Sequence, residues 1–122
     1  MNKETIKEMD RMWGKLVAYD FKYRCFMCGL PATDPHHWFI HRWDLRTRWE
    51  RLNGVYLCRS CHTYAHGYKG KILERIKTNS KIRWDWMVAI REGEIKPSFS
   101  EEVGELLYNT MKIQLEILGI PI

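Results

Sequence analysis

The sequence has no long apolar run. No stretch approaches the roughly 18 consecutive apolar residues of a membrane-spanning helix, so we expect no membrane partner. The N-terminal segment MNKETIKEMD is charged from its start, and the apolar stretch of a signal peptide does not follow it. We therefore expect a cytoplasmic protein, in which the four cysteines would not form disulfides.

Internal repeats, low-complexity segments and long linkers are also missing. A chain of 122 residues suits one domain with one modest core. We divide it into an N-terminal helical part (1–24), a central part (25–78) and C-terminal helices (79–122). This order predicts a small α+β fold.

Acidic residues are scarce in the middle of the chain. Residues 36–83 hold eleven Lys or Arg against three Asp or Glu, whereas residues 94–122 hold two against five. The middle therefore has the charge of a polyanion-binding region, and the C-terminal part does not. Charge alone leaves a solvated basic surface as an equal alternative.

Helical periodicity marks four segments. The first covers residues 4–20, where five apolar residues form one stripe. A second is expected over about 60–77, although Gly67 and Gly70 weaken it, and a third over 80–91. Ser98 or Ser100 can cap the last helix. The expected apolar faces are Ile6, Met9, Trp13, Leu16 and Val17 in the first helix, Ile82, Trp86 and Ile90 in the third, and Val103, Leu106, Leu107, Met111 and Leu118 in the last.

Two short strands are expected between these helices. Residues 36–43 are rich in aromatics and residues 55–57 are Val-Tyr-Leu, both typical of strands. Residues 25–35 are broken by Gly29, Pro31 and Pro35 and predict a loop. The polar stretch before the second strand predicts another loop, with Asn53-Gly54 as its turn.

The cysteines form two Cys-x-x-Cys pairs, CFMC (25–28) and CRSC (58–61). Two such pairs complete a tetrahedral four-thiolate zinc site, which is closed and therefore structural. The alternative is a redox-active or merely buried pair. Twenty-nine residues separate Cys28 from Cys58, more than the 15–20 of a simple zinc ribbon. The zinc would pin together the ends of an inserted strand-turn-strand unit.

Histidine is also sparse, yet four of the five histidines fall into two close pairs. His62 and His66 are four residues apart, so on a helix they share one face and can bind one metal ion. His36 and His37 are adjacent, and along a strand their side chains point to opposite faces. One metal ligand and one base is therefore the natural division, although ordinary packed histidines remain the alternative. We expect His41 to be a surface or DNA-facing residue.

The run HH (36–37), Asn53 and LCRSCHTYAH (57–66) resembles the HNH, or His-Me finger, endonucleases. The resemblance covers about residues 25–72 and implies a ββα-metal core, stapled by a four-cysteine zinc. It implies that His37 is the general base and that His36, His62 and His66 bind a catalytic ion. Asn53 would fix the loop and the base through hydrogen bonds, although a plain turn residue is the alternative. HWFIHRWDLRTRWERLNGVYLCRSC is more distantly similar to phage Rap/NinG-type recombination nucleases.

The resemblance implies hydrolysis of DNA phosphodiester bonds, leaving 5′-phosphate and 3′-hydroxyl ends. A histidine with a near-neutral pKa can deprotonate water, and a metal ion can stabilise the leaving oxygen. The ion would be Mg²⁺, Mn²⁺, Ni²⁺ or Zn²⁺. The setting would be phage or mobile-element DNA processing in a bacterial host cell. The rival hypotheses are a non-catalytic zinc-finger module that binds nucleic acid and a structural subunit of a DNA-packaging or recombination complex.

Cationic and aromatic side chains alternate around this motif. The expected phosphate contacts are Arg42, Arg46, Arg48, Arg51, Arg59, Lys69 and Lys71. Three tryptophans, Trp38, Trp43 and Trp49, lie among these arginines. We expect them to be buried against the zinc knuckle, with stacking of one on an unpaired base as the alternative. The C-terminal helix is expected in the core, with a homodimer surface as the alternative.

Overall fold

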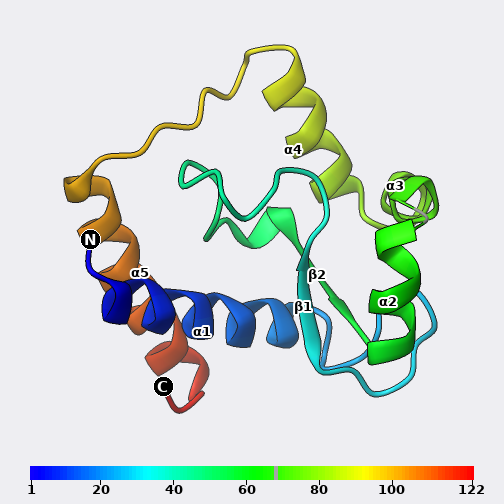
Figure 1. The fold of residues 1–122 in the computed structure, drawn as a ribbon, viewed down its shortest axis with the longest axis horizontal. Coiled ribbons are helices and arrows are strands. Elements are labelled where there is room, and N and C mark those ends of the chain that lie inside the picture. The colour runs from blue at the N-terminus through cyan, green and yellow to red at the C-terminus, as the bar shows by residue number, and fades with distance from the viewer. Residues whose placement is uncertain (68) are drawn as a thin grey trace.

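The computed structural model describes residues 1–67 and 69–122. In this part of the chain a two-stranded antiparallel sheet lies among five α-helices, which makes a small α+β fold (Figure 1). The elements are α1 (Lys3–Asp20), β1 (Asp34–His37), a 3₁₀ turn η1 (Arg51–Asn53), β2 (Gly54–Leu57), α2 (Arg59–Gly67), α3 (Lys69–Asn79), α4 (Lys81–Arg91) and α5 (Glu101–Leu118).

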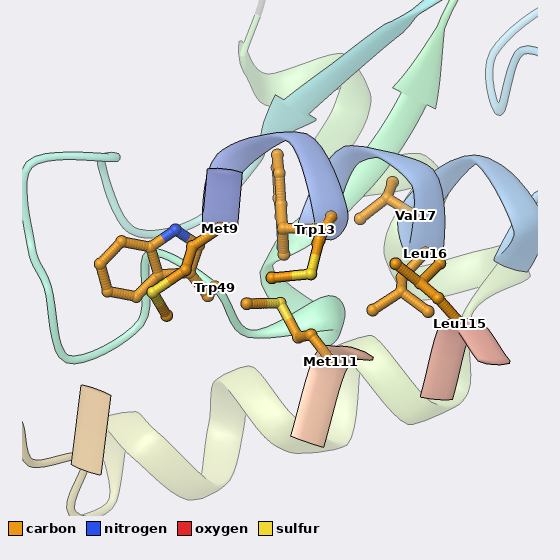
Figure 2. Close-up of a cluster of buried hydrophobic side chains, with 8 residues drawn as sticks. Met9, Trp13, Leu16, Val17, Trp49, Met111 and Leu115 are labelled. Carbon is orange, nitrogen blue, oxygen red and sulfur yellow. The ribbon is translucent and has the colours of Figure 1, made fainter. Parts of the chain in front are cut away.

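Helix α1 carries the predicted apolar stripe. Asn2 caps its start by accepting a hydrogen bond from the Thr5 backbone N–H at 2.8 Å. Figure 2 shows the stripe packed against Met111 and Leu115 of α5, with the Trp49 indole at one end. Four of the five predicted stripe residues are buried, and Ile6 is half-buried at the edge of this cluster.

The first strand begins earlier and ends sooner than predicted, and the second includes Gly54 as well as residues 55–57. The loop expected over 25–35 therefore ends at residue 33, because Asp34 and Pro35 belong to β1. β1 ends at His37, where it pairs with Gly54, and the expected strand residues 38–43 belong instead to a long loop. Side chains hold this loop by hydrogen bonds to its backbone, in place of the backbone pairing of a longer β-ladder. The indoles of Trp38 and Trp13 donate to the carbonyls of Leu52 and Glu50, at 2.7 and 3.0 Å. The prediction of strand over 36–43 is therefore wrong beyond His37.

Gly54 is a strand residue rather than the turn residue expected from Asn53-Gly54. Its backbone is extended, so no left-handed turn requires a glycine here. A Cβ atom at this position would lie 2.5 Å from Val17 Cγ2 and 2.9 Å from Trp13 Cζ2. Glycine is therefore needed because α1 packs directly onto β2.

The helix expected over 60–77 is two helices. α2 ends at Gly67 and α3 begins at Lys69, and the two run in different directions (Figure 1). Residue 68, which the prediction included, lies outside the described residues. Glycines at 67 and 70 lower helix propensity at this junction, which favours two helices over one. A second core cluster lies under α2 and α3 and consists of Cys25, Val55, Leu57, Ala65, Ile72 and Ile76.

Helices α4 and α5 expose part of the faces that the sequence predicts to be buried. Ile82 of α4 is 62% exposed and Leu106 of α5 is 66% exposed. α5 packs against α1 through a side that includes the buried residues Met111 and Leu115. Ser100 caps α5 by accepting from the Val103 N–H at 3.2 Å. Among the described residues no helix is long and apolar enough to cross a bilayer.

Candidate metal centres and cleft

The four cysteines converge from the loop after α1 and from the junction of β2 with α2. Their sulfurs lie within 4.8 Å of one another, and Cys28 Sγ and Cys58 Sγ are 3.7 Å apart. Four thiolates on zinc at about 2.3 Å would be spaced by roughly 3.8 Å. Gly29, in the left-handed region with φ 78°, completes the turn of the first pair. This cluster could therefore hold a structural zinc ion.

The chemistry of the sulfurs fits a cation. Burial opposes ionisation of Cys25, but backbone N–H groups of Cys58 and Cys28 outweigh burial and lower the pKa of its thiol to about 7. Burial and the neighbouring thiols raise the pKa of Cys61. Four sulfurs at these distances cannot all lose their protons unless a positive ion balances them.

A second group of ligands lies between the hairpin and α2. Side-chain nitrogens of His36 on β1 and of His62 and His66 on α2 lie within 4.8 Å of one another. The ring of His36 is 5.1 Å from that of His62 and 5.4 Å from that of His66, measured between centroids. The predicted trio is therefore brought together, and modest side-chain movement would allow all three rings to hold one divalent ion.

Asp34 orients this trio, and sequence reasoning did not single it out. Its Oδ2 lies 2.9 Å from His62 Nδ1, so that nitrogen donates and Nε2 stays available for a metal ion. Burial of Asp34 opposes its ionisation, but hydrogen bonds from Thr33, His62 and Arg59 outweigh burial and lower its pKa to about 2. Its place two residues before His36 on a strand, and hence on the same face, is the signal that could have revealed it.

His36 is suited to a ligand's role because it stays neutral. Burial disfavours the imidazolium, and the nearby His62 and His66 add repulsion, so the pKa of His36 falls to about 4. A metal ion therefore meets a free lone pair on His36 at neutral pH.

His37 occupies the opposite face of the strand. Its ring stacks on Trp13 of α1, with centroids 4.1 Å apart and planes 7° apart. His37 Nε2 lies 2.7 Å from the Arg48 carbonyl oxygen, which can only accept. Nε2 therefore carries the proton, and the lone pair of the neutral ring is on Nδ1. Burial, together with the charges of Arg42 and Arg48, lowers the pKa of His37.

Asn53 is fully buried at the end of the loop. Its Oδ1 accepts from the backbone N–H groups of Phe39 and Ile40 at 3.2 and 3.0 Å, and its Nδ2 donates to the Ile40 carbonyl at 2.8 Å. Asn53 thus ties the loop residues Phe39 and Ile40, which follow His37, to the start of β2 by hydrogen bonds. The His37 ring itself is held by Arg48 and Trp13, so Asn53 contacts the backbone after His37 rather than the ring.

Both faces open into one cleft of about 540 Å³. Its walls include the histidine trio, the His37 ring and cationic side chains at the rim. The histidines and cationic residues that line the cleft are His36, His37, His41, Arg42, His62, His66 and Lys69. A candidate metal centre and a candidate base therefore share one solvent-accessible space.

The predicted phosphate contacts divide into two groups. Arg48 donates two hydrogen bonds to Asp10, at 2.9 and 2.7 Å, and Arg51 pairs with Asp20. These two guanidinium groups are partly buried, and they hold the loop to α1. The other five side chains are exposed. They are Arg42, Arg46, Arg59, Lys69 and Lys71.

The three loop tryptophans have three environments. Trp49 is buried with Met9 and Met111, and its indole donates to Asp10 at 2.9 Å. Its cluster is the one between α1 and α5, so Trp49 does not lie against the cysteine knuckle as expected. Trp38 is half-buried at the edge of the second core cluster, and its indole donates to the Leu52 carbonyl. Trp43 is 79% exposed, so its expected burial is wrong.

Comparisons with protein-family models, with curated proteins and with solved structures return no match. The functional argument therefore depends on the geometry of the cysteine cluster, the histidine trio and the cleft.

Proposed function

We propose that this protein is a metal-dependent DNA endonuclease with an HNH-type, ββα-metal active site. One observation supports the proposal above all others. Three histidines that can share a metal ion and a fourth histidine with a free ring nitrogen line the same cleft, from opposite faces of one hairpin. Ordinary packed histidines have no reason to converge in this way beside a basic rim.

His37 is the proposed general base. The Arg48 carbonyl and the Trp13 ring fix its orientation, so that Nδ1 can take a proton from a water molecule that attacks phosphorus. Its lowered pKa keeps the ring unprotonated at neutral pH. Such a base accelerates hydrolysis typically by about 10²–10⁴-fold.

The proposed ligands of the catalytic ion are His36, His62 and His66. When bound, a divalent ion would supply Lewis-acid stabilisation of the charge on the scissile phosphate and the leaving 3′-oxygen. Asp34 keeps the His62 ring turned toward the shared point through the 2.9 Å contact at Nδ1. Neutral imidazoles suit Zn²⁺, Ni²⁺ or Mn²⁺, and Mg²⁺ is the choice when DNA supplies oxygen ligands.

DNA is the proposed polyanion. Arg42 and Lys69 stand at the cleft, where they would hold the phosphates on either side of the cut. Arg46, Arg59 and Lys71 extend the basic surface, whereas Arg48 and Arg51 act from beneath it by positioning the loop. The proposed setting is DNA processing by a phage or mobile element in the bacterial cytoplasm. A homodimer through the exposed apolar residues of α5, such as Ile113 and Ile117, is part of this proposal.

The rival function is a zinc-finger module that binds nucleic acid without cutting it. Metal analysis of the purified protein separates the two. A nuclease should hold one tight zinc ion and one weaker, exchangeable ion, and His62→Ala should lose only the second. The binding module should hold one ion in both proteins.

A protein that binds the second metal ion should also cleave DNA. Supercoiled plasmid, linear duplex, single strand and a four-way junction, each incubated with Mg²⁺, Mn²⁺ or Ni²⁺, should reveal at least one substrate that is cut. Thr63→Ala, on the exposed side of α2, is the control for His62→Ala. Salt-sensitive binding with no cutting under any metal would favour the binding module.

A further inference from the structure

One exposed tryptophan has no role in the proposed reaction. Trp43 is 79% exposed, although tryptophan is usually among the more buried residues. It is far more exposed than Trp38 or Trp49 of the same loop. One exposed apolar side chain is common on a protein surface, so the surroundings of Trp43 have to indicate whether it meets a partner.

The loop presents this ring in a fixed orientation. The Trp43 and His41 ring centroids are 4.1 Å apart, and the backbone N–H of Trp43 donates to His41 Nδ1 at 3.4 Å. Asp44 closes two turns, because its N–H donates to the His41 carbonyl and its carbonyl accepts from Thr47. Asp44 also accepts three hydrogen bonds from Arg46. The ring is therefore preorganised before any ligand arrives.

The position of the ring points to nucleic acid. His41 and Arg42 line the cleft, and the Trp43 ring contacts His41, so Trp43 lies just outside the cleft. Arg42, the residue before Trp43, is 57% exposed and only loosely paired with Asp10 at 3.9 Å, whereas Arg46 is paired with Asp44. A flat exposed ring next to a cationic residue at the cleft fits a nucleotide, whose base stacks on the ring while its phosphate meets the Arg42 guanidinium. A paired, stacked duplex offers no free base face inside the helix.

We propose that Trp43 is a stacking platform for an unpaired base next to the scissile phosphate. The substrate class of the cleft is then DNA that carries unpaired bases beside the cut, such as a flap, a gap or a branch. This inference rests on the proposed nuclease function and adds its substrate preference. Trp43 is a specificity residue, and the loop from His41 to Thr47 fixes where the base is placed.

The test compares Trp43→Ala and Trp43→Phe with the unchanged protein. Binding is measured without added divalent ion to a duplex and to the same duplex with a three-base gap that contains 2-aminopurine. We expect Trp43→Ala to weaken binding to the gapped DNA by roughly 5- to 150-fold. It should change binding to the intact duplex by less than about twofold. Trp43→Phe should retain part of the preference, and Leu45→Ala, in the same loop, should retain all of it.

Fluorescence gives a second readout that loss of folding would not mimic. The unchanged protein should quench 2-aminopurine in the gap, and Trp43→Ala should not, while both keep the same melting temperature. Equal preference for gapped DNA in Trp43→Ala and the unchanged protein would overturn the inference alone, provided that cleavage continues. Absence of both DNA binding and cleavage in the unchanged protein would overturn the nuclease function and this inference with it.

Discussion

Two aspartates orient the imidazole and guanidinium groups around the cleft. Asp34 faces His62 on the metal side of the hairpin, and Asp10 faces Arg48 and Trp49 on the side of α1. Each holds a functional or supporting side chain in one rotamer. Their substitution should therefore separate ion binding from loop stability.

Asp34→Ala should weaken binding of the second metal ion. Without the carboxylate, the His62 ring loses the contact that fixes its tautomer and orientation, and such losses typically cost about 10–100-fold in affinity. The cysteine-bound zinc should remain. Titration of the zinc-loaded protein with Mn²⁺ or Ni²⁺ measures the change. Asp44→Ala, which removes another arginine-paired carboxylate, is the control, and equal affinity in all three proteins would contradict the proposed role of Asp34.

Asp10→Asn should destabilise the fold near neutral pH by about 1–3 kcal/mol, because charge-assisted hydrogen bonds from Arg48 and Trp49 are weakened. Burial opposes ionisation of Asp10, but these partners outweigh burial and hold its pKa below the usual 3.8. A lowered folded-state pKa contributes stability that is complete above the unfolded value and is lost as pH falls through the folded value. The stability difference should therefore be constant from pH 7 to 5 and shrink below about pH 4.

Urea unfolding of both proteins at a series of pH values measures this difference. The cysteine site is common to both proteins, so its loss in acid affects them equally. A difference that shrinks already between pH 7 and 5 would show that another group is responsible.

Among the structural elements, contact between α1 and the hairpin fixes the position of the His37 ring, the proposed base. Gly54 pairs with His37, and the same glycine gives room to Trp13, on which the His37 ring stacks. Gly54 therefore links α1, the hairpin and His37, the proposed base.

Gly54→Ala should destabilise the protein by about 1–3 kcal/mol, the usual cost of overpacking. The added methyl would press on Val17 and Trp13, both held in the core beneath α1. Gly67→Ala is the matched control, since a Cβ there meets no atom of the described residues within 4 Å and alanine favours the helix. Thermal melting measures both, and equal melting temperatures for Gly54→Ala and the unchanged protein would contradict the packing account.

Local patterns in the sequence predict some of these elements well and others poorly. The α1 stripe and the opposite faces of His36 and His37 follow from the periods of helix and strand, and the structure agrees with both. The aromatic run after His37 reads as a strand, yet Asn53 and the tryptophan indoles bind its backbone from distant positions. The pairing of Arg48 with Asp10 spans 38 residues and has no local signal.

In the whole molecule, two hydrophobic clusters share the hairpin. One lies between α1 and α5, and the other lies beneath α2 and α3 beside the cysteines. The second cluster is small for its task of placing α2 against the hairpin. The cysteine spacing predicts the four-cysteine site. It does not predict that Cys25 lies in the same hydrophobic cluster as Val55 and Leu57, which the structure shows.

Removal of zinc should therefore disorder the half of the molecule that carries α2. In small domains a structural metal ion supplies folding energy that the core lacks. Cys28→Ser and treatment with a strong chelator should each lower α-helical circular dichroism and abolish the second metal site, because His62 and His66 lose their position. An unchanged spectrum after complete zinc removal, verified by metal analysis, would contradict a structural role for the ion.

The most direct test of the proposed function is the rate of metal-dependent cleavage by His37→Ala. We expect a loss of about 10²–10⁴-fold relative to the unchanged protein, because the substitution removes the proposed base, Nδ1 of the ring that the Arg48 carbonyl orients through Nε2. Metal content and DNA binding should stay the same, and Thr63→Ala should cut normally. Near-normal cleavage by a folded, metal-loaded His37→Ala protein would contradict the assignment of the base and the active site built around it.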